Sequence, residues 1–237
     1  RKEGWRFLSN LQKLESPRRL MMNISIALPV GRLFDDTADF LEILGIQVKS
    51  PAPRELISST DGYTFYFPRV FDIPVYVENG VDLGICGSDV VLERGSEVYM
   101  PTDLPFGKCR MSLIVPRGRK ISLEEMEGYK IGSKYPEITK SFFSNVGIRV
   151  KTLKLNGAVE LAAKAGIVDA IVDIVDTGNT LRVNDLEELH KIKDISAVLI
   201  VNRISQKTKF AFVNELVNRI KKLKRELSAK DKRGREQ

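Results

Sequence analysis

One segment of the chain combines acidic residues, glycine and threonine in an order suited to a sugar phosphate. It runs from Asp173 to Leu181 and reads Asp-Ile-Val-Asp-Thr-Gly-Asn-Thr-Leu. Gly178 lets the backbone approach a ligand closely and adopt dihedral angles that other residues avoid. The hydroxyls of Thr177 and Thr180 are further donors, and the first N–H groups of the helix predicted to follow attract an anion. The segment therefore predicts a site for a phosphate monoester.

The two aspartates of this segment, Asp173 and Asp176, repel phosphate but suit ribose hydroxyls or a Mg²⁺ ion carried by pyrophosphate. Apart from its aspartates, the stretch 169–175 is apolar, which predicts a buried strand with an acidic exit. A strand–Thr-Gly–helix junction is also often a simple turn and helix cap, so that interpretation stays open. The same order of residues resembles the loop of purine and pyrimidine phosphoribosyltransferases, which suggests a phosphoribosyl donor before any acceptor.

Strands and helices that alternate along the chain must position this segment, and their order predicts an α/β fold. The predicted strands are 24–28, 63–67, 81–85, 111–115, 129–132, 149–153, 169–175 and 196–201. The predicted helices lie within 33–44, 72–80, 122–128, 136–147, 157–165 and 207–228. Small open sheets of this kind bind ligands at the carboxyl ends of their strands. We therefore expect two small domains whose strand-end loops face a common cleft.

The net charge of +7 belongs to the two ends of the chain. Residues 1–20 carry six Lys/Arg and two Asp/Glu, and 207–237 carry eleven and four, which leaves 21–206 at −4. An acidic body argues against nucleic acid as a partner, and we interpret the basic ends as solvated. The single histidine, His190, lies in a charged stretch that reads as a surface helix.

Cysteine content and hydropathy indicate a cytoplasmic protein with no role at a membrane. Cys86 and Cys109 lack the spacing of metal ligands and read as reduced thiols. No apolar run approaches the roughly 20 residues that span a bilayer. The N-terminus is charged and has no apolar signal core, so no secretion signal is expected.

Several further segments, taken in order, resemble the ATP phosphoribosyltransferase family over nearly all of 23–205. They are Ile26–Leu33, Asp72–Val77, Asp82–Val90, Gly107–Arg110, Ser133–Pro136, Leu155–Leu161, Asp169–Leu181 and Leu199–Asn202. The resemblance implies two periplasmic-binding-protein-like (type II) α/β domains with the active site in the cleft between them. It also implies that N1 of ATP attacks C1 of 5-phosphoribosyl 1-pyrophosphate (PRPP). The products are 1-(5-phosphoribosyl)-ATP and pyrophosphate, in the first step of L-histidine biosynthesis.

The domain boundaries expected with this architecture split the first domain in sequence. Residues 1–22 are an N-terminal extension, and 23–106 plus 188–226 form domain I. Residues 107–187 form domain II with the PRPP loop, and 227–237 form a basic tail.

The resemblance implies roles for individual residues. Catalysis falls to Glu160, Asp173 and Arg32. PRPP binding falls to Asp173, Asp176, Thr177, Gly178, Asn179 and Thr180. No protein metal site is implied, since Mg²⁺ arrives with PRPP and meets at most Glu160 or Asp173. Helix capping is an equal alternative for Glu160. No strong general base is needed, because adenine N1 attacks with its own lone pair.

ATP binding is expected from strand-end residues of both domains. They are Arg32, Gly87, Ser88, Arg110, Lys134 and Tyr135. Guanidinium groups grip phosphates through two parallel hydrogen bonds, although surface ion pairing is an alternative for both arginines. Tyr135 lies beside adenine or packs as an aromatic. Many family members have a lysine where this chain has Val30, so Arg32 or another lysine must serve the first loop.

The end of the chain resembles the short form of the family. Only 34 residues follow Arg203, below the roughly 50 residues of an ordinary domain. The short form works with a separate regulatory subunit related to histidyl-tRNA synthetase, and we expect a homo-oligomer. The apolar side of the last predicted helix, Phe212 to Leu227, is either an assembly surface or packs on the chain's own body.

Three other interpretations compete with this one. A solute-binding protein of the same architecture gives no reason for the Thr-Gly-x-Thr loop. A phosphoribosyltransferase with another acceptor base shares that loop. An RNA-associated protein would act through its basic ends, which the acidic body disfavours.

Overall fold

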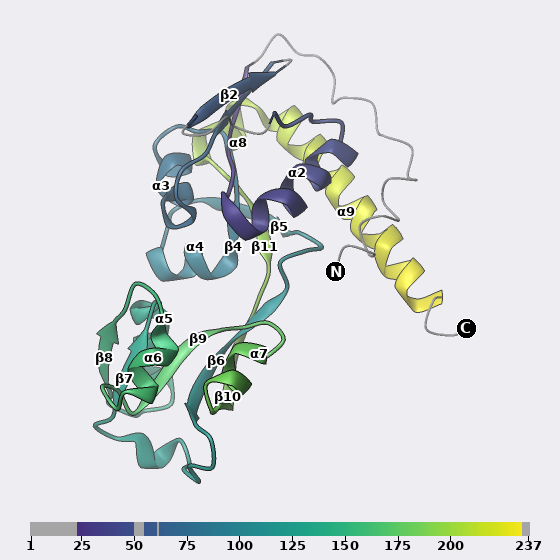
Figure 1. The fold of residues 1–237 in the computed structure, drawn as a ribbon. Coiled ribbons are helices and arrows are strands. Elements are labelled where there is room, and N and C mark those ends of the chain that lie inside the picture. The colour runs from purple at the N-terminus through teal and green to yellow at the C-terminus, as the bar shows by residue number, and fades with distance from the viewer. Residues whose placement is uncertain (1–22, 50–54, 61, 234–237) are drawn as a thin grey trace. The chain divides into compact units, whose positions relative to one another are not determined.

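The computed structural model of the chain describes residues 23–49, 55–60 and 62–233 (Figure 1). The described chain divides into two compact units. Unit 1 runs up to Val91 and continues with Ser96–Gly107 and the chain from Ala197 onward, and unit 2 consists of Leu92–Gly95 and Lys108–Ser196. The expected extension 1–22 lies outside the described residues. Among those described, no helix is long and apolar enough to cross a membrane.

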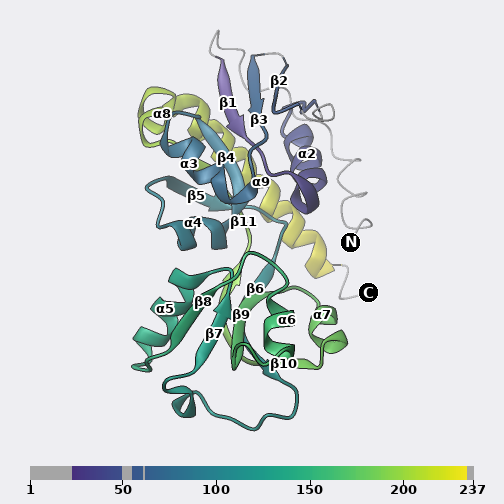
Figure 2. The ribbon, with the colours of Figure 1, turned by 60° about the vertical axis from the view of Figure 1, so that its left-hand side comes forward.

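Unit 1 is built on a six-stranded sheet in the order β2-β3-β1-β4-β11-β5 (Figure 2). Its strands are β1 Ile24–Ala27, β2 Ile57–Thr60, β3 Tyr63–Tyr66, β4 Leu83–Gly87, β5 Tyr99–Asp103 and β11 Ala197–Val201. The three neighbours β3, β1 and β4 are parallel, whereas β2, β11 and β5 each run antiparallel to the strand they pair with. The carboxyl ends of β1, β3 and β4 therefore lie along one edge.

Helices cover both faces of the unit 1 sheet. They are α2 Phe34–Ile43, α3 Ile73–Glu78, α4 Ser88–Arg94, α8 Arg203–Thr208 and α9 Phe210–Arg233, with 3₁₀ turns η2 Gly31–Leu33 and η3 Val70–Asp72. Successive strand side chains point to opposite faces. Ile26 accordingly packs in a core with Phe40 of α2 and Leu216 of α9, while the adjacent Ala27 packs in a second core with Val77 of α3.

The sequence left open whether the apolar side of the last helix is an assembly surface or packs on the chain's own body. The long α9 helix answers this question. Its apolar side is buried against the unit 1 sheet, with Phe212 7% exposed and Ile220 1% exposed. The last member of this side, Leu227, is partly buried against the same core. The helix continues to Arg233, past the expected start of a tail at 227. The apolar side thus packs on the chain's own body.

Unit 2 is built on a five-stranded sheet in the order β10-β6-β9-β7-β8 (Figure 2). Its strands are β6 Cys109–Pro116, β7 Lys130–Ser133, β8 Lys151–Lys154, β9 Ala170–Val175 and β10 Leu186–Ile195. Its helices are α5 Pro136–Asn145, α6 Val159–Lys164 and α7 Asn179–Val183, with the 3₁₀ turn η4 Glu124–Met126. Strands β8, β7 and β9 are parallel, and β6 and β10 are antiparallel additions.

Strand β10 replaces the charged helix expected around His190. Its apolar residues Leu186, Leu189, Ile192 and Ile195 recur every third position, which imitates a helix. The strand pairs with β6 through two register shifts, between Glu188 and His190 and between Lys191 and Lys193. Each shift inserts an extra residue and lengthens the repeat of a strand from two to three. His190 is exposed as expected, with its ring 5.4 Å from that of Phe142.

Strand β10 also determines where the chain passes from unit 2 back into unit 1. The sequence placed the crossing between 187 and 188, but unit 2 extends to Ser196. The reason is that β10 pairs along its whole length with β6, from Leu186 opposite Pro116 to Ile195 opposite Cys109. The next strand, β11, then enters the unit 1 sheet beside β4.

Candidate active site

The topology of unit 2 brings three predicted segments to one edge of its sheet. Strands β8, β7 and β9 are parallel neighbours, so the loops that follow them emerge on the same side. The loop after β7 is Lys134-Tyr135, the loop after β8 leads through residues 155–158 to Glu160, and the loop after β9 is 176–178. The segments that the sequence assigned to PRPP and to part of the ATP site thus share one edge.

The loop after β9 leaves its polar groups facing outward. Gly178 has a left-handed backbone with φ 75°, which residues with a side chain adopt at a cost. Leu181 is buried at 7% exposure and anchors α7 in the unit 2 core. The side chains of Thr177, Asn179 and Thr180 are exposed. Because α7 has five residues, its dipole is small, and the loop must rely on N–H and hydroxyl donors.

Asp173 lies on the same face of the sheet as two residues of β6. Ser112 pairs with Asp173, and Arg110 pairs with Val175. The Arg110 guanidinium forms an ion pair with Glu188 of β10. The pKa of the Glu188 carboxyl is lowered, chiefly by its hydrogen bond with Arg110, while partial burial opposes this and Ser112 adds to it. Arg110, which we predicted as a phosphate ligand, is therefore engaged within the protein.

Tyr135 is buried at 4% exposure and belongs to the interior of unit 2. This placement fits the aromatic-packing alternative rather than a ring lying open beside adenine. The preceding Ser133 fixes the loop, because its hydroxyl donates to the Val172 carbonyl oxygen at 2.7 Å and accepts from the Tyr135 N–H at 2.9 Å. Ser133 thus ties the loop after β7 to strand β9. Lys134 between them is half-buried.

Replacing Ser133 by alanine should destabilise unit 2 by about 2 kcal/mol, since it removes the hydrogen bond to the Val172 carbonyl oxygen and leaves the buried Tyr135 N–H without its acceptor. Urea unfolding followed by circular dichroism measures this loss. Ser144→Ala removes an exposed hydroxyl of α5 and should change the free energy of unfolding by less than about 0.5 kcal/mol. Equal effects of the two substitutions would contradict the bridging role of Ser133.

Glu160 stands at the start of α6 after a strained residue. Ala158, the N-cap of α6, has a left-handed backbone with φ 45° and ψ 46° and makes no side-chain capping hydrogen bond. Such strain in a non-glycine residue costs of the order of 1–2 kcal/mol and clusters at functional sites. Within the described chain, the Glu160 carboxylate makes no hydrogen bond or ion pair, so helix capping does not account for it.

The corresponding edge of the unit 1 sheet carries the other predicted ATP-binding residues. Arg32 is exposed in η2 after β1, and Gly87 and Ser88 join β4 to α4. A Cβ atom on Gly87 would lie 2.0 Å from Oδ1 of Asp89, so a larger residue there would require the Asp89 carboxylate to move. Val30, which stands where many family members have a lysine, is 42% exposed and has no charged group.

Sequence reasoning missed a cation at this edge, Arg69. It follows β3, the parallel neighbour of β1, and its side chain is exposed. Its carbonyl oxygen accepts the Asp72 N–H at 2.8 Å, and its side chain makes no ion pair or hydrogen bond to the described residues. Its position in the sequence could have indicated it, since Arg69 comes shortly after a predicted strand and before the segment Asp72–Val77.

A protein-only metal site is not built into the described residues, which contain no group of three or more His, Cys, Asp or Glu side chains placed to hold an ion. Mg²⁺ is usually held by one or two carboxylates together with substrate phosphates. Asp173, whose Oδ1 accepts the Ile174 N–H at 2.8 Å, and Glu160 fit that limited role. The donor set is thus suited to an ion that arrives bound to pyrophosphate.

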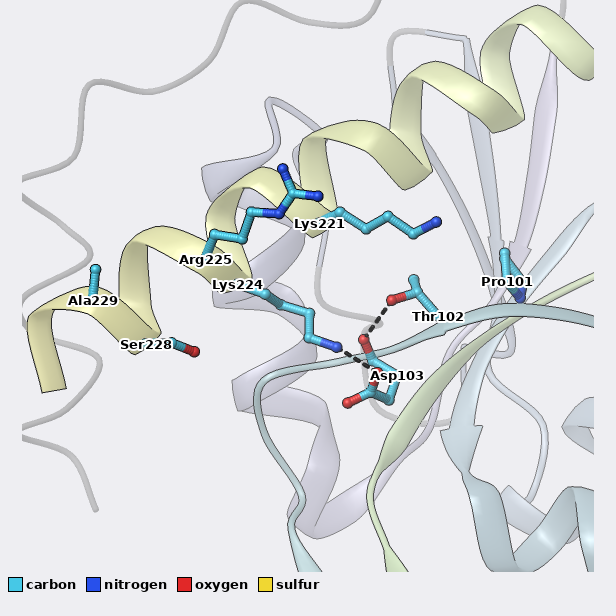
Figure 3. A pocket seen from close by; sticks show the side chains of 8 residues that line it. All are labelled: Pro101, Thr102, Asp103, Lys221, Lys224, Arg225, Ser228 and Ala229. Carbon is cyan, nitrogen blue, oxygen red and sulfur yellow. Dashed lines mark hydrogen bonds and ion pairs between the residues drawn. The ribbon is translucent and has the colours of Figure 1, made fainter. Parts of the chain in front are cut away.

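A hollow on the surface of unit 1 lies elsewhere and contains none of the predicted substrate-binding residues. It measures about 680 Å³ and is lined by residues of β5 and of the second half of α9 (Figure 3). In it, Lys224 points to Asp103 and forms an ion pair, and the Thr102 hydroxyl donates to the Asp103 carbonyl oxygen. Its place on the edge strand β5, two strands from β4, separates it from the carboxyl ends of β1, β3 and β4.

Comparison with known proteins places this geometry in a family. A family model described as ATP phosphoribosyltransferase matches residues 69–222. An ATP phosphoribosyltransferase of Petrotoga mobilis is 69% identical over 204 residues, covering 86% of this chain and 97% of that protein. Another, of Pyrococcus furiosus, is 53% identical over 195 residues, covering 82% and 96%.

Solved structures agree in fold. A chain of the ATP phosphoribosyl transferase (HisG:HisZ) complex from Thermotoga maritima is similar with a TM-score of 0.75 and 31% identity, covering 86% of this chain and 99% of that one. The substrate-binding protein of an amino acid ABC transporter, at 18% identity and a TM-score of 0.57 over 87% of this chain and 97% of its own, shares the fold alone. The expected periplasmic-binding-protein-like architecture is therefore confirmed. With the family model matching most of the sequence, the chain belongs to the ATP phosphoribosyltransferase family, the pentosyltransferases of the first step of histidine biosynthesis.

Proposed function

We propose that this chain joins N1 of ATP to C1 of PRPP and that the loop of residues 176–180 holds the 5′-phosphate of PRPP. As the N1–C1 bond forms, the bond between C1 and the pyrophosphate oxygen breaks, and pyrophosphate leaves with the electron pair. Membership of the family supports the reaction. The observation that supports the placement is the outward-facing set of donors at Thr177, Gly178 and Thr180 on the carboxyl edge of unit 2.

The residues around this loop suit a reaction that separates charge at C1. The transition state resembles an oxocarbenium ion, which nearby carboxylates stabilise electrostatically. Asp173 and Glu160 are the carboxylates we assign to the ribose, with Asp176 at the start of the loop. Mg²⁺ bound to the substrate would neutralise charge on the pyrophosphate, and Glu160 or Asp173 would meet the ion from the protein. The exposed guanidiniums of Arg32 and Arg69 supply positive charge for polyphosphate on unit 1.

The reaction needs positioning more than proton transfer. Adenine N1 carries its own lone pair at neutral pH, so attack requires no base. This agrees with the exposed position of His190 outside the predicted substrate-binding segments. Holding two substrates in a reactive geometry supplies much of the rate acceleration in such a case.

Product analysis tests the proposal. The chain is incubated with ATP, PRPP and Mg²⁺, and the ultraviolet absorbance change is followed, with mass spectrometry of the product. We expect an N1-linked phosphoribosyl-ATP adduct and no adduct with free adenine or a pyrimidine base in place of ATP. Transfer to a free base but not to ATP would identify the acceptor alternative instead. Binding of a solute without transfer would identify a binding protein.

We also propose that the active assembly contains more than one copy of this chain and a separate regulatory subunit. The similar chain from Thermotoga maritima was solved in a HisG:HisZ complex and is covered by this chain over 99% of its length. The adduct assay is therefore to be run with and without a regulatory subunit related to histidyl-tRNA synthetase. We expect the subunit to change the rate and to co-elute with this chain in size-exclusion chromatography.

A further inference from the structure

The guanidinium of Arg110 connects two strands to the loop that follows β9. Its Nε donates to Oε2 of Glu188 at 2.7 Å, and its Nη2 forms the ion pair with the other carboxylate oxygen. Its Nη1 donates to the backbone carbonyl oxygen of Asp176 at 3.1 Å. One side chain of β6 thus holds a carboxylate of β10 and the first residue of the loop at the same time.

Glu188 is itself fixed from a second side. Its Oε2 accepts the hydroxyl of Ser112 at 2.8 Å, and Ser112 is fully buried. The side chains of Arg110 and Glu188 are 34% and 26% exposed, so solvent screens the pair only in part. A guanidinium held by both oxygens of a carboxylate has a defined plane. The direction of Nη1 toward Asp176 is therefore set by the strand pairing and not by the loop.

The held carbonyl determines where the next N–H points. The C=O of Asp176 and the N–H of Thr177 belong to one planar trans peptide and point in opposite directions. Drawing the oxygen toward Arg110 turns the Thr177 N–H away from the guanidinium. Within the described residues this N–H makes no hydrogen bond, and Thr177 is exposed. The N–H is a donor left available at the loop.

We propose that Arg110 and Glu188 are positioning residues, which fix the Asp176–Thr177 peptide so that the Thr177 N–H faces the 5′-phosphate of PRPP. This inference rests on the proposed function of the loop. It assigns Arg110 a different part from direct phosphate binding, since Nε, Nη1 and Nη2 each donate one hydrogen bond within the protein and these bonds fix the plane of the guanidinium. Glu188, which the sequence did not single out, becomes part of the PRPP site without touching the substrate.

The two roles for Arg110 predict different effects of one substitution on the apparent KM for PRPP. If Arg110 positions the peptide, Glu188→Gln weakens the hold on the guanidinium and raises the apparent KM for PRPP. If Arg110 instead binds a substrate phosphate, Glu188→Gln frees it from its carboxylate and leaves that KM unchanged or lower. Arg110→Lys keeps the charge but cannot bridge Glu188 and the Asp176 carbonyl together.

The test is steady-state kinetics of the assembled enzyme with each substrate varied in turn. We expect Glu188→Gln and Arg110→Lys each to raise the apparent KM for PRPP about tenfold, as for one lost charge-assisted hydrogen bond. The KM for ATP should stay within about twofold. The double variant should be no worse than either single one, because both remove the same constraint. A general loss of stability would not separate the two substrates in this way.

Glu187→Gln is the matched control. Glu187 is the neighbour of Glu188 in β10, and its Oε1 accepts the Gly118 N–H at 2.9 Å, away from Arg110 and the loop. It should leave both KM values unchanged. Thermal melts of all variants check the fold, and Ser112→Ala, with an expected rise of about threefold, replaces Glu188→Gln if that variant does not fold.

The outcomes separate this inference from the proposed function. An active wild type whose Glu188→Gln variant keeps its KM for PRPP overturns the positioning role alone. Equal rises for ATP and PRPP, or additive effects in the double variant, also overturn it. A folded and assembled wild type that does not use PRPP removes the proposed function, and the inference falls with it.

Discussion

Replacing Thr177 and Thr180 together by alanine should raise the apparent KM for PRPP about 100-fold, equivalent to about 3 kcal/mol. Two hydroxyl hydrogen bonds to a charged phosphate account for this amount, at about 1.5 kcal/mol each. Both threonines are exposed beside Gly178, so their removal leaves the core of unit 2 intact. The KM for ATP should rise less than about threefold, because the proposed ATP contacts lie on other segments. Steady-state kinetics with each substrate varied in turn measures the split.

A matched control removes two other exposed hydroxyls from the same unit. Ser141 and Ser144 lie in the second half of α5 and are both exposed. Their replacement by alanine should leave both KM values unchanged. If the double threonine variant raised the two KM values equally, the 5′-phosphate would not be bound at this loop.

Replacing Lys209 by methionine should destabilise unit 1 by about 3 kcal/mol, because it leaves a buried carboxylate without its counter-charge. Lys209 and Asp82 form an ion pair at 2.7 Å, with side chains 19% and 8% exposed. The same oxygen, Oδ2, also accepts the N–H and the hydroxyl of Ser25 at 2.8 Å each, and the other oxygen, Oδ1, accepts the Ser205 hydroxyl at 2.6 Å. The network ties the start of β1 and β4 to α8. Urea unfolding at pH 7 measures the loss.

The pH dependence of this loss identifies its cause. Burial raises the pKa of Asp82, but the hydrogen bonds from Lys209, Ser205 and Ser25 outweigh it and lower the pKa below its ordinary value of 3.8. A carboxyl with a depressed folded-state pKa contributes stability above its unfolded pKa and loses it as the pH falls through the folded value. The difference between wild type and Lys209→Met should therefore be full above about pH 5 and shrink at lower pH.

Arg203→Met provides the comparison. Arg203 is the first residue of α8, the helix that Lys209 directly follows, and it pairs with Glu97 at 2.8 Å, but the two side chains are 65% and 76% exposed. Its loss should change the free energy of unfolding by less than about 0.5 kcal/mol. A Lys209→Met variant as stable as Arg203→Met, or equally destabilised at pH 3 and pH 7, would show that the buried pair does not stabilise unit 1.

Local sequence patterns predicted those strands, turns and helices whose conformation depends mainly on neighbouring residues in the sequence. The apolar run 169–175 became β9, and the glycine at 178 has the left-handed backbone its position required. The apolar side of α9 was visible at helical spacing before its partner was known. Strand β10 was not predictable in this way, because two register shifts gave its apolar residues the period of a helix.

The candidate site was predictable where one segment carries it and not where distant strands meet. The loop of residues 176–180 lies in one stretch of sequence, so its donors were recognised together. The pairing of Arg110 with Glu188 joins residues 78 positions apart through the register of β6 and β10. No local pattern contains that information, so the sequence could not indicate that Glu188 and the Asp176 carbonyl oxygen engage Arg110. Glu160, whose carboxylate has no partner within the described chain, was identified by the resemblance alone.

A crystal structure of the chain with Mg²⁺ and PRPP is the most direct test of the central claim. We predict the 5′-phosphate of PRPP within hydrogen-bonding distance of the Thr177 N–H and of the hydroxyls of Thr177 and Thr180, with Asp173 next to the ribose. A PRPP molecule whose 5′-phosphate is held by other residues, with the loop of residues 176–180 making no contact to it, would contradict the claim.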